Sequence, residues 1–219
     1  MILIPVKNLS GAKQRLSNVL DQPARTELAQ AMLQDVVSAI AAWKARPACA
    51  LVTSDSFAIE LARQYDFEIV PDLANPGETA AIEMATKICV ARGVESTLVI
   101  PADIPLIQAK DLSQIFQAAP TEGSVLVPAA DGRGTNAAFR RPANLFPLRF
   151  GNDSFKPHLA GARATGKPCV VLQLAGIGVD VDNPDDLQAI LQLPGETRTQ
   201  SLLRRWQSVG CFQAKGMTP

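Results

Sequence analysis

Three cations and a turn of small residues lie close together near the amino terminus. Residues 7–16 read Lys-Asn-Leu-Ser-Gly-Ala-Lys-Gln-Arg-Leu, so Lys7, Lys13 and Arg15 fall within nine positions. Ser10-Gly11-Ala12 lets backbone amides approach a triphosphate, whose charge the three cations would neutralise. The segment matches neither G-x-x-x-x-G-K-[ST] nor G-x-G-x-x-G, and a solvated basic loop has the same composition. Its place after the first expected strand favours triphosphate binding.

Three aspartates supply the oxygen ligands that Mg²⁺ prefers. Asp103 follows a buried apolar run, where a helix or turn cap is the alternative role. Asp180 and Asp182 are two residues apart in an extended segment, so both side chains face the same side and could share one metal. However, Asp182-Asn183-Pro184-Asp185 also has the pattern of a helix N-cap followed by an early proline. We expect one of these carboxylates to cap a helix and another to bind metal.

Two further segments have the features of an anion site. Gly132-Arg133-Gly134-Thr135-Asn136-Ala137 is a loop that enters a strand and offers side-chain donors, including Thr135. Phe150-Gly151-Asn152-Asp153-Ser154-Phe155 then opens a helix, where free backbone amides and the Ser154 hydroxyl would hold an anion. A plain N-cap role for Ser154 is compatible with this interpretation.

His158 is the only histidine and lies one turn inside that helix. A Ser-His-Asp or Cys-His hydrolase would need it, but the chain has no G-x-S-x-G elbow. We interpret His158 as a residue that packs or contacts substrate.

Apolar runs rich in β-branched residues alternate with helical segments, which is typical of a mostly parallel central sheet flanked by helices. Strands are expected at residues 2–6, 48–53, 68–70, 97–100, 124–127, 137–140 and 169–174, with a short piece at Val179. A long first helix follows Pro23, with an apolar stripe at Leu28, Met32, Val36 and Ile40. Further helices are expected at 80–92, 109–118, 154–165, 184–191 and near 197–206. Ligands of open α/β sheets bind outside the carboxyl ends of the strands, where the polar residues above converge.

Composition excludes several other classes of protein. The 219 residues carry 21 Lys and Arg against 21 Asp and Glu, so no global positive field would hold nucleic acid. There is no C-x-x-C pair, which with a single histidine argues against zinc, and no apolar run of 18 residues spans a membrane. No signal peptide is visible, and we expect a cytoplasmic protein with reduced thiols. We expect one domain over 1–219, with a polar tail from about 208.

Five short motifs occur in one order along most of the chain: Ile4-Pro5-Val6-Lys7 with Ala12-Lys13-Gln14-Arg15-Leu16, Pro101-Ala102-Asp103-Ile104-Pro105, Gly132-Arg133-Gly134-Thr135-Asn136, Phe150-Gly151-x-x-Ser154-Phe155, and Gly178-Val179-Asp180-Val181-Asp182. Together they resemble the CofC/FbiD family, the guanylyltransferases of coenzyme F420 biosynthesis. The resemblance implies a single-domain nucleotidyltransferase fold of the glycosyltransferase A-like type. It implies transfer of GMP from GTP, with Mg²⁺, to 2-phospho-L-lactate, phosphoenolpyruvate or 3-phospho-D-glycerate.

The resemblance also assigns roles to residues. Asp103, Asp180 and Asp182 fall on the family's metal positions, and Thr135, Gly151 and Ser154 fall on its phospho-acid positions. For nucleotide binding we expect Lys7, Lys13, Arg15, Glu78 and Asp103, with the three cations also serving catalysis. The expected partners are GTP, the acid and a downstream transferase that consumes the labile product, with a homodimer left open. Alternatives are a molybdenum-cofactor or sugar-phosphate nucleotidyltransferase and a non-catalytic nucleotide-binding module.

The chain departs from the family pattern in two places, and each departure adds a negative charge. Gly77-Glu78-Thr79-Ala80-Ala81 replaces Gly-Leu-Asn-Ala-Ala, and Asn152-Asp153 replaces Pro-Gly. The Glu78 carboxylate could accept guanine N1–H and N2–H, a pair of donors that adenine lacks. Alternatively Asn75 and Glu78 have the spacing of a capping box, which we weight slightly higher.

Overall fold

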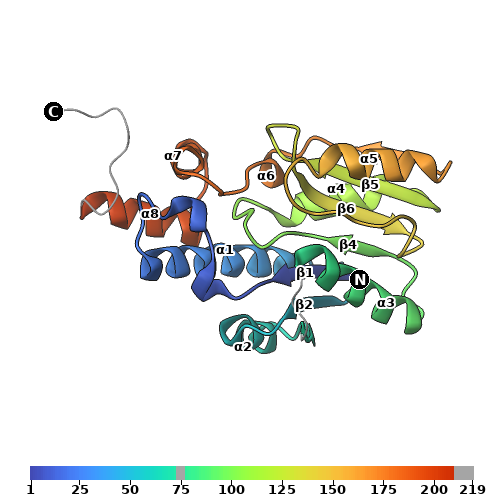
Figure 1. The fold of residues 1–219 in the computed structure, drawn as a ribbon, viewed down its shortest axis with the longest axis horizontal. Helices are drawn as coiled ribbons and strands as arrows, with labels where there is room; N and C mark the ends of the chain where they lie inside the picture. Colours follow the sequence, from blue (N-terminus) through green and yellow to red (C-terminus); the bar gives the residue numbers. More distant parts are fainter. Residues whose placement is uncertain (73–76, 210–219) are drawn as a thin grey trace.

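The computed structural model describes residues 1–72 and 77–209. Its strands are β1 (Ile2–Val6), β2 (Cys49–Thr53), β3 (Glu68–Val70), β4 (Thr97–Val99), β5 (Gly123–Pro128), β6 (Thr135–Arg141) and β7 (Cys169–Val171). They form one sheet in the order β3-β2-β1-β4-β6-β5-β7 (Figure 1). Strand β6 runs antiparallel to β4 and β5, and the other neighbours are parallel. The expected mostly parallel sheet is confirmed.

Helices cover both faces of this sheet. They are α1 (Gln22–Ala42), α2 (Ser56–Gln64), α3 (Glu78–Ala91), α4 (Ala109–Ala118), α5 (Phe155–Ala164), α6 (Ala175–Gly178), α7 (Pro184–Gln192) and α8 (Arg198–Ser208), with short 3-10 turns η1 (Leu9–Gly11) and η2 (Gln14–Leu16). Apolar residues of α1, α2, α4, α7 and α8 pack in one core cluster, and those of α3 and α5 pack in another. Side chains of β1 alternate between the clusters, since Ile2 and Ile4 join the first and Leu3 the second. None of the described helices is long and apolar enough to cross a bilayer.

The segment between β7 and α7 differs from expectation. β7 ends at Val171, Leu174 caps the short helix α6, and Val179 is extended without belonging to the sheet. Buried Leu174 and Ile177 are three residues apart, which is a helical spacing. Gly176 also lies so close to α4 that an added Cβ would stand 2.2 Å from Asp111 Oδ2. The expected strands at 169–174 and Val179 are therefore wrong beyond Val171.

Two other features were outside the expectation. Helix α2 was not predicted, although Asp55 caps it by accepting from the Ala58 N–H at 3.0 Å. The antiparallel direction of β6 was not predicted either. Of the expected polar tail, residues 210–219 lie outside the described part of the chain.

Candidate active site

The sheet brings the polar residues of distant segments to one edge. Lys7 follows β1 directly, and Asp103 lies four residues beyond the end of β4, which is hydrogen-bonded to β1. Because β6 runs antiparallel to β4, its first residue, Thr135, lies at the edge where β4 ends. The carboxyl ends of the parallel strands and the start of β6 therefore face the same space.

Residues 177–182 are attached to this edge without a strand. The Val181 N–H donates to the Asp103 carbonyl at 3.2 Å. The Asn136 amide donates to the Ile177 carbonyl at 2.8 Å and to Asp180 Oδ1 at 3.2 Å. These bonds bring Asp180 and Asp182 to the same edge of the sheet as Asp103.

Lys13 joins two of the three aspartates. Its Nζ donates to Asp103 Oδ2 at 2.6 Å and to Asp182 Oδ1 at 3.0 Å, and its side chain is 11% exposed. Burial disfavours the ammonium, but the two carboxylates outweigh it and raise the pKa of Lys13. Its backbone is left-handed, with φ 52°, a conformation costly for a residue with a Cβ. Lys13 is thus a fixed cation in the site.

Arg15 extends the ion pairs toward the helix α5. One guanidinium nitrogen donates to Asp182 Oδ2 at 3.1 Å and the other to Asn152 Oδ1 at 2.9 Å. Asn152 belongs to the loop that opens α5, so Arg15 connects the basic loop with the loop that carries Gly151. Asp55 secures the basic loop from the other side, because its Oδ2 accepts from the Leu9 N–H at 2.9 Å.

A cavity of about 610 Å³ lies between the basic loop, the turn at Asp103 and the Asp182 carboxylate. Its charged lining consists of Lys7, Lys13, Arg15, Glu78, Asp103 and Asp182. The size is within the range of small-molecule sites. A second cavity of about 470 Å³ lies beside α1 and α8, away from the strand ends. The five residues expected to bind the nucleotide, Lys7, Lys13, Arg15, Glu78 and Asp103, therefore line the larger cavity together.

The residues expected to hold the acid lie around α5. Thr135 Oγ1 is 2.9 Å from Nδ1 of His158, one turn beyond Ser154. Ser154 is 4% exposed, and its hydroxyl makes no hydrogen bond with the described residues. Ser154 therefore stands at the N-cap position of α5 without capping the helix through its side chain, and its hydroxyl is left for a ligand.

The comparisons with known proteins identify the family. The model of the family described as "Guanylyl transferase CofC like" matches residues 1–213. The chain belongs to this CofC family.

Curated relatives of this CofC-family protein differ in the acid that they use. It is 34% identical over 204 residues to a phosphoenolpyruvate guanylyltransferase of Roseiflexus castenholzii, covering 93% of each chain. It is 33% identical to a 2-phospho-L-lactate guanylyltransferase of Methanothermobacter thermautotrophicus, covering 93% of this chain and 89% of the relative. It is 29% identical to a 3-phospho-D-glycerate guanylyltransferase of Colwellia psychrerythraea, covering 92% and 95%.

Solved structures support the nucleotidyltransferase fold. A structure from Desulfovibrio desulfuricans G20, provisionally described as a nucleotide-diphospho-sugar transferase, superposes with a TM-score of 0.77 at 17% identity, covering 95% of each chain. A nucleotidyl transferase from Methanothermobacter superposes with a TM-score of 0.61 at 18% identity, covering 94% of this chain and 99% of that one. The CofC-family chain therefore has the expected nucleotidyltransferase fold.

The aspartates of this CofC protein suit a hard cation, although they are not preassembled around one. Burial, and then the like charges of Asp103 and Asp182, raise the pKa of Asp180. A divalent cation would relieve that repulsion, and carboxylate oxygens are suitable ligands for it. Within residues 1–72 and 77–209, however, no group of three acidic, histidine or cysteine side chains is arranged to hold a metal. The Lys13 ammonium lies between two of the three carboxylates instead.

The expected helix cap next to these aspartates is shifted by one residue. Asn183 caps α7 by accepting from the Asp185 and Asp186 N–H groups. Asp182 uses its carboxylate for Lys13 and Arg15, so a capping role for Asp182 is wrong. Asparagine accepts these N–H bonds as well as aspartate does, and this leaves the Asp182 carboxylate to line the cavity. Asp180 is not among the residues that line it, and its carboxylate accepts from the Asn136 amide.

The anion site at the start of α5 is weaker than expected. The Phe155 N–H donates to the Arg133 carbonyl at 2.8 Å, and Pro157 has no N–H to offer. The Asp153 charge, which departs from the family pattern, lies 3.8 Å from the Arg133 guanidinium. Asp153 has φ 54°, a region where glycine or aspartate is tolerated better than most residues. Side-chain hydroxyls, more than helix amides, are left to hold an acid.

Glu78 does not form the alternative capping box. It is the first residue of α3, whose N-cap is Gly77, while a box would need Glu78 at the third position. Asn75, the other member of that box, lies outside the described residues. Burial, and then repulsion from Asp103, raise the pKa of Glu78 to about 7, although Lys7 and Lys13 oppose the shift. The Glu78 side chain therefore belongs to the cavity.

Proposed function

We propose that this CofC-family protein transfers GMP from GTP to the phosphate of a small phosphorylated three-carbon acid, as a step of coenzyme F420 biosynthesis. The candidate acids are 2-phospho-L-lactate, phosphoenolpyruvate and 3-phospho-D-glycerate, which the relatives' names include. The observation that carries the proposal is the Arg15 bridge between Asp182 in the cavity and Asn152 in the loop that carries Gly151. It supports two anion sites in direct contact, one for the triphosphate and one for the acid.

The reaction is a substitution at the α-phosphorus of GTP. An oxygen of the substrate phosphate forms a bond to that phosphorus while the bond to the bridging β-phosphate oxygen breaks, and pyrophosphate leaves. A phosphate whose second pKa is about 6 is already largely a dianion at neutral pH, so no general base is needed. Catalysis would then come from alignment and charge neutralisation by Lys7, Lys13 and Arg15, a role supported by their common place in the cavity lining.

Asp103, Asp180 and Asp182 would hold Mg²⁺ beside the triphosphate in this proposal. The metal ion would neutralise charge that develops on the phosphate oxygens. Binding and orientation of the substrates would fall to the residues of the chain. Lys13 and Arg15 would bind phosphate oxygens, and the acid would be oriented by Thr135, Gly151 and Ser154. The product is a labile diphosphate ester, and we propose that a downstream transferase in the cytoplasm consumes it.

A product assay tests the proposal directly. The protein is incubated with GTP, Mg²⁺ and one acceptor at a time, and the products are identified by mass. The acceptors are the three acids, a sugar phosphate and a molybdenum-cofactor precursor. We expect one acid to give its guanosine diphosphate ester with one pyrophosphate for each GTP consumed. Turnover only with a sugar phosphate or a molybdenum-cofactor precursor would assign the chain to another nucleotidyltransferase. GTP binding without pyrophosphate release would mean a non-catalytic module.

Ser154→Ala is expected to raise the KM of the acid about tenfold and to leave the KM of GTP nearly unchanged. The change removes one hydroxyl hydrogen bond to a charged group, which is worth about 1.5 kcal/mol. Because the hydroxyl bonds to none of the described residues, the thermal midpoint should hold. Steady-state kinetics with each substrate varied in turn measure the split. An increase confined to GTP would assign this corner to the nucleotide.

Glu78→Gln is expected to erode the preference for GTP over ATP if the carboxylate accepts the guanine N–H donors. An unpaired buried donor costs about 1 to 3 kcal/mol, so the preference should fall roughly 5-fold to 150-fold. Comparison of kcat/KM for GTP and ATP in the two proteins measures this. If Glu78 only faces the triphosphate, the substitution should lower the KM of both nucleotides equally, and the base-reading role would be wrong.

The same substitution has a pH signature in the absence of ligands. With a pKa raised from 4.5 to about 7, folded Glu78 keeps a proton that the unfolded chain has lost. Its contribution to stability therefore decreases as the pH rises through that window. The free energy of unfolding of Glu78→Gln minus that of the parent should grow between about pH 5 and about pH 8. A constant difference in metal-free denaturant titrations would contradict the buried, charged environment of Glu78.

A further inference from the structure

The sole histidine joins the two segments that carry the expected acid-binding residues. His158 is fully buried in α5. Its Nδ1 lies 2.9 Å from Thr135 Oγ1, at the start of β6, and its Nε2 accepts from the Arg149 N–H at 2.7 Å. Arg149 is two residues before Gly151. One imidazole therefore contacts both sides of the proposed acid site.

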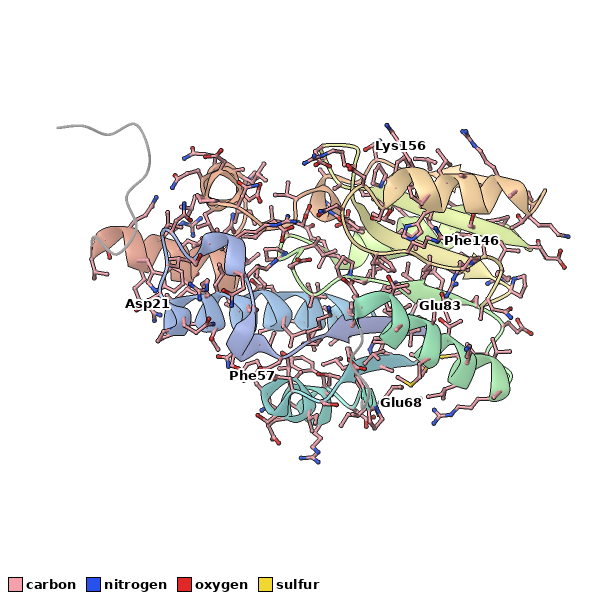
Figure 2. All side chains as sticks on the ribbon, viewed as in Figure 1. Asp21, Phe57, Glu68, Glu83, Phe146 and Lys156 are labelled. Atoms are coloured by element: carbon pink, nitrogen blue, oxygen red, sulfur yellow. The ribbon has the colours of Figure 1, made fainter. Side chains whose placement is uncertain are left out.

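The Arg149 bond fixes the tautomer of this imidazole. A backbone N–H can only donate, so Nε2 must be unprotonated, and the neutral ring then carries its hydrogen on Nδ1. Burial, and to a smaller extent the charge of Arg140, lower the pKa of His158 to about 4. Arg140 of β6 donates to the carbonyl of Phe146 at 2.6 Å and lies 3.5 Å from the carboxylate of Glu83 in α3. Figure 2 labels Phe146 and Glu83. The ring is therefore a neutral donor toward Thr135 at neutral pH.

The Thr135 hydroxyl is left with a hydrogen to donate. Its oxygen accepts from the Nδ1–H of His158, and no acceptor for its own O–H exists among the described residues. Thr135 is 4% exposed, and a hydroxyl in such a buried position normally has a hydrogen-bond partner. An anionic acid oxygen would be a suitable acceptor.

The backbone on the other side of the site is held from two directions. Besides the Arg149 bond, the Phe150 N–H donates to Thr79 Oγ1 at 3.0 Å, and that hydroxyl lies 3.3 Å from the Phe150 carbonyl oxygen. The Phe150 ring meets the His158 ring edge-on, with centroids 5.0 Å apart. Gly151 follows with φ 129°, a conformation that side chains rarely adopt. Thr79 and His158 together set the course of the chain into Gly151.

We propose that His158 is a positioning residue for the phospho-acid, whose ring fixes the Thr135 hydroxyl as a donor and anchors the backbone that leads to Gly151. The inference rests on the proposed acid site at Thr135, Gly151 and Ser154. His158 itself touches no reacting atom, because its side chain is fully buried and both ring nitrogens are bonded within the protein. Its role is therefore visible in the binding of one substrate and not in the chemistry.

Two substitutions separate the two bonds of the ring. His158→Gln places an amide near the position of Nε2 and loses the hydrogen-bond donor to Thr135. His158→Asn places its amide near the position of Nδ1 and loses the hydrogen-bond acceptor for the Arg149 N–H. We expect His158→Gln to raise the KM of the acid about tenfold, with the KM of GTP nearly unchanged. Thr135→Val should have a similar effect, and His158→Gln should add almost nothing in the Thr135→Val background. His158→Asn should keep its effect in that background.

The outcomes distinguish this inference from the proposed site. If Thr135→Val and Ser154→Ala leave the KM of the acid unchanged, the acid does not bind there and the site assignment fails. If they raise it while His158→Gln does not, or if His158→Gln and Thr135→Val act additively, only the positioning role is wrong. Equal increases in both KM values would indicate a merely structural histidine.

A measurement on the parent protein does not depend on the folding of variants. Since the chain has one histidine, nitrogen-15 NMR of histidine-labelled protein gives the signals of one ring. We expect the neutral tautomer with hydrogen on Nδ1, no titration between about pH 5.5 and about pH 8, and a shift when the productive acid is added. Hydrogen on Nε2, or titration near the ordinary pKa, would overturn the proposal.

Discussion

Asp103→Asn is expected to lower kcat/KM about a thousandfold or more, the largest effect of any single substitution in this protein. Asparagine keeps the size of the side chain but removes a charge beside Lys13 and a ligand for the metal ion. Loss of metal-derived stabilisation is worth several kcal/mol in the transition state, and about 4 kcal/mol corresponds to a thousandfold. The thermal midpoint of the metal-free protein should change little, because the lost ion pair between Lys13 and Asp103 is offset by weaker repulsion among the three aspartates.

Asp185→Asn is the matched control for that experiment. Asp185 is exposed in the first turn of α7, three residues from Asp182, and contributes nothing to the cavity lining. Its kinetics should stay close to those of the parent protein. If Asp103→Asn and the Asp180/Asp182 double asparagine variant both keep near-normal, Mg²⁺-dependent rates, the proposed metal site is wrong.

The regular elements could be predicted where burial makes a simple pattern. β1 and α4 have the expected bounds, because a strand buried on both faces is continuously apolar and α4 has one clear apolar face. β3 also has the expected bounds, although it is an edge strand that begins with an exposed glutamate. Helix α6 and the end of β7 could not be predicted from the sequence, since the close approach of Gly176 to Asp111 depends on tertiary packing. For β6 a signal was present. Only six residues connect it to β5, and a parallel crossover needs a dozen or more.

The candidate site was predictable as a set of residues but not as a set of bonds. Strand ends and helix starts identify Lys13, Asp103 and Asp182 because such places converge in an α/β fold. The ion pairs of Lys13 span 90 and 169 positions, and no local pattern encodes contacts at that separation. The hydrogen bond from Arg15 to Asn152 could not be predicted from the sequence either. Only the packed structure places Asn152 at the end of Arg15.

The basic loop illustrates how this changes an expectation. The composition of the loop predicts equivalent roles for Lys13 and Arg15, as two cations that bind a triphosphate. In the folded protein the Lys13 side chain is 11% exposed and pairs with both Asp103 and Asp182. The Arg15 side chain is 62% exposed and pairs with Asp182 alone of these two carboxylates. The two residues should therefore differ in what they contribute to stability as well as to turnover.

Lys13→Met is expected to lower kcat/KM for GTP roughly a hundredfold to a thousandfold and to destabilise the metal-free protein. Methionine fills the space of the stem but leaves Asp103 and Asp182 as neighbouring charges without the ammonium between them. Mg²⁺ should then raise the thermal midpoint of Lys13→Met more than that of the parent, because a divalent cation takes over the same carboxylates.

Arg15→Met is the exposed control. It should lose turnover with little change in the thermal midpoint or in the dependence of that midpoint on Mg²⁺. Thermal unfolding along a Mg²⁺ titration measures the difference. Equal Mg²⁺ responses in the three proteins would mean that the ammonium and the metal ion do not share these carboxylates, and the ligand set would have to be sought elsewhere.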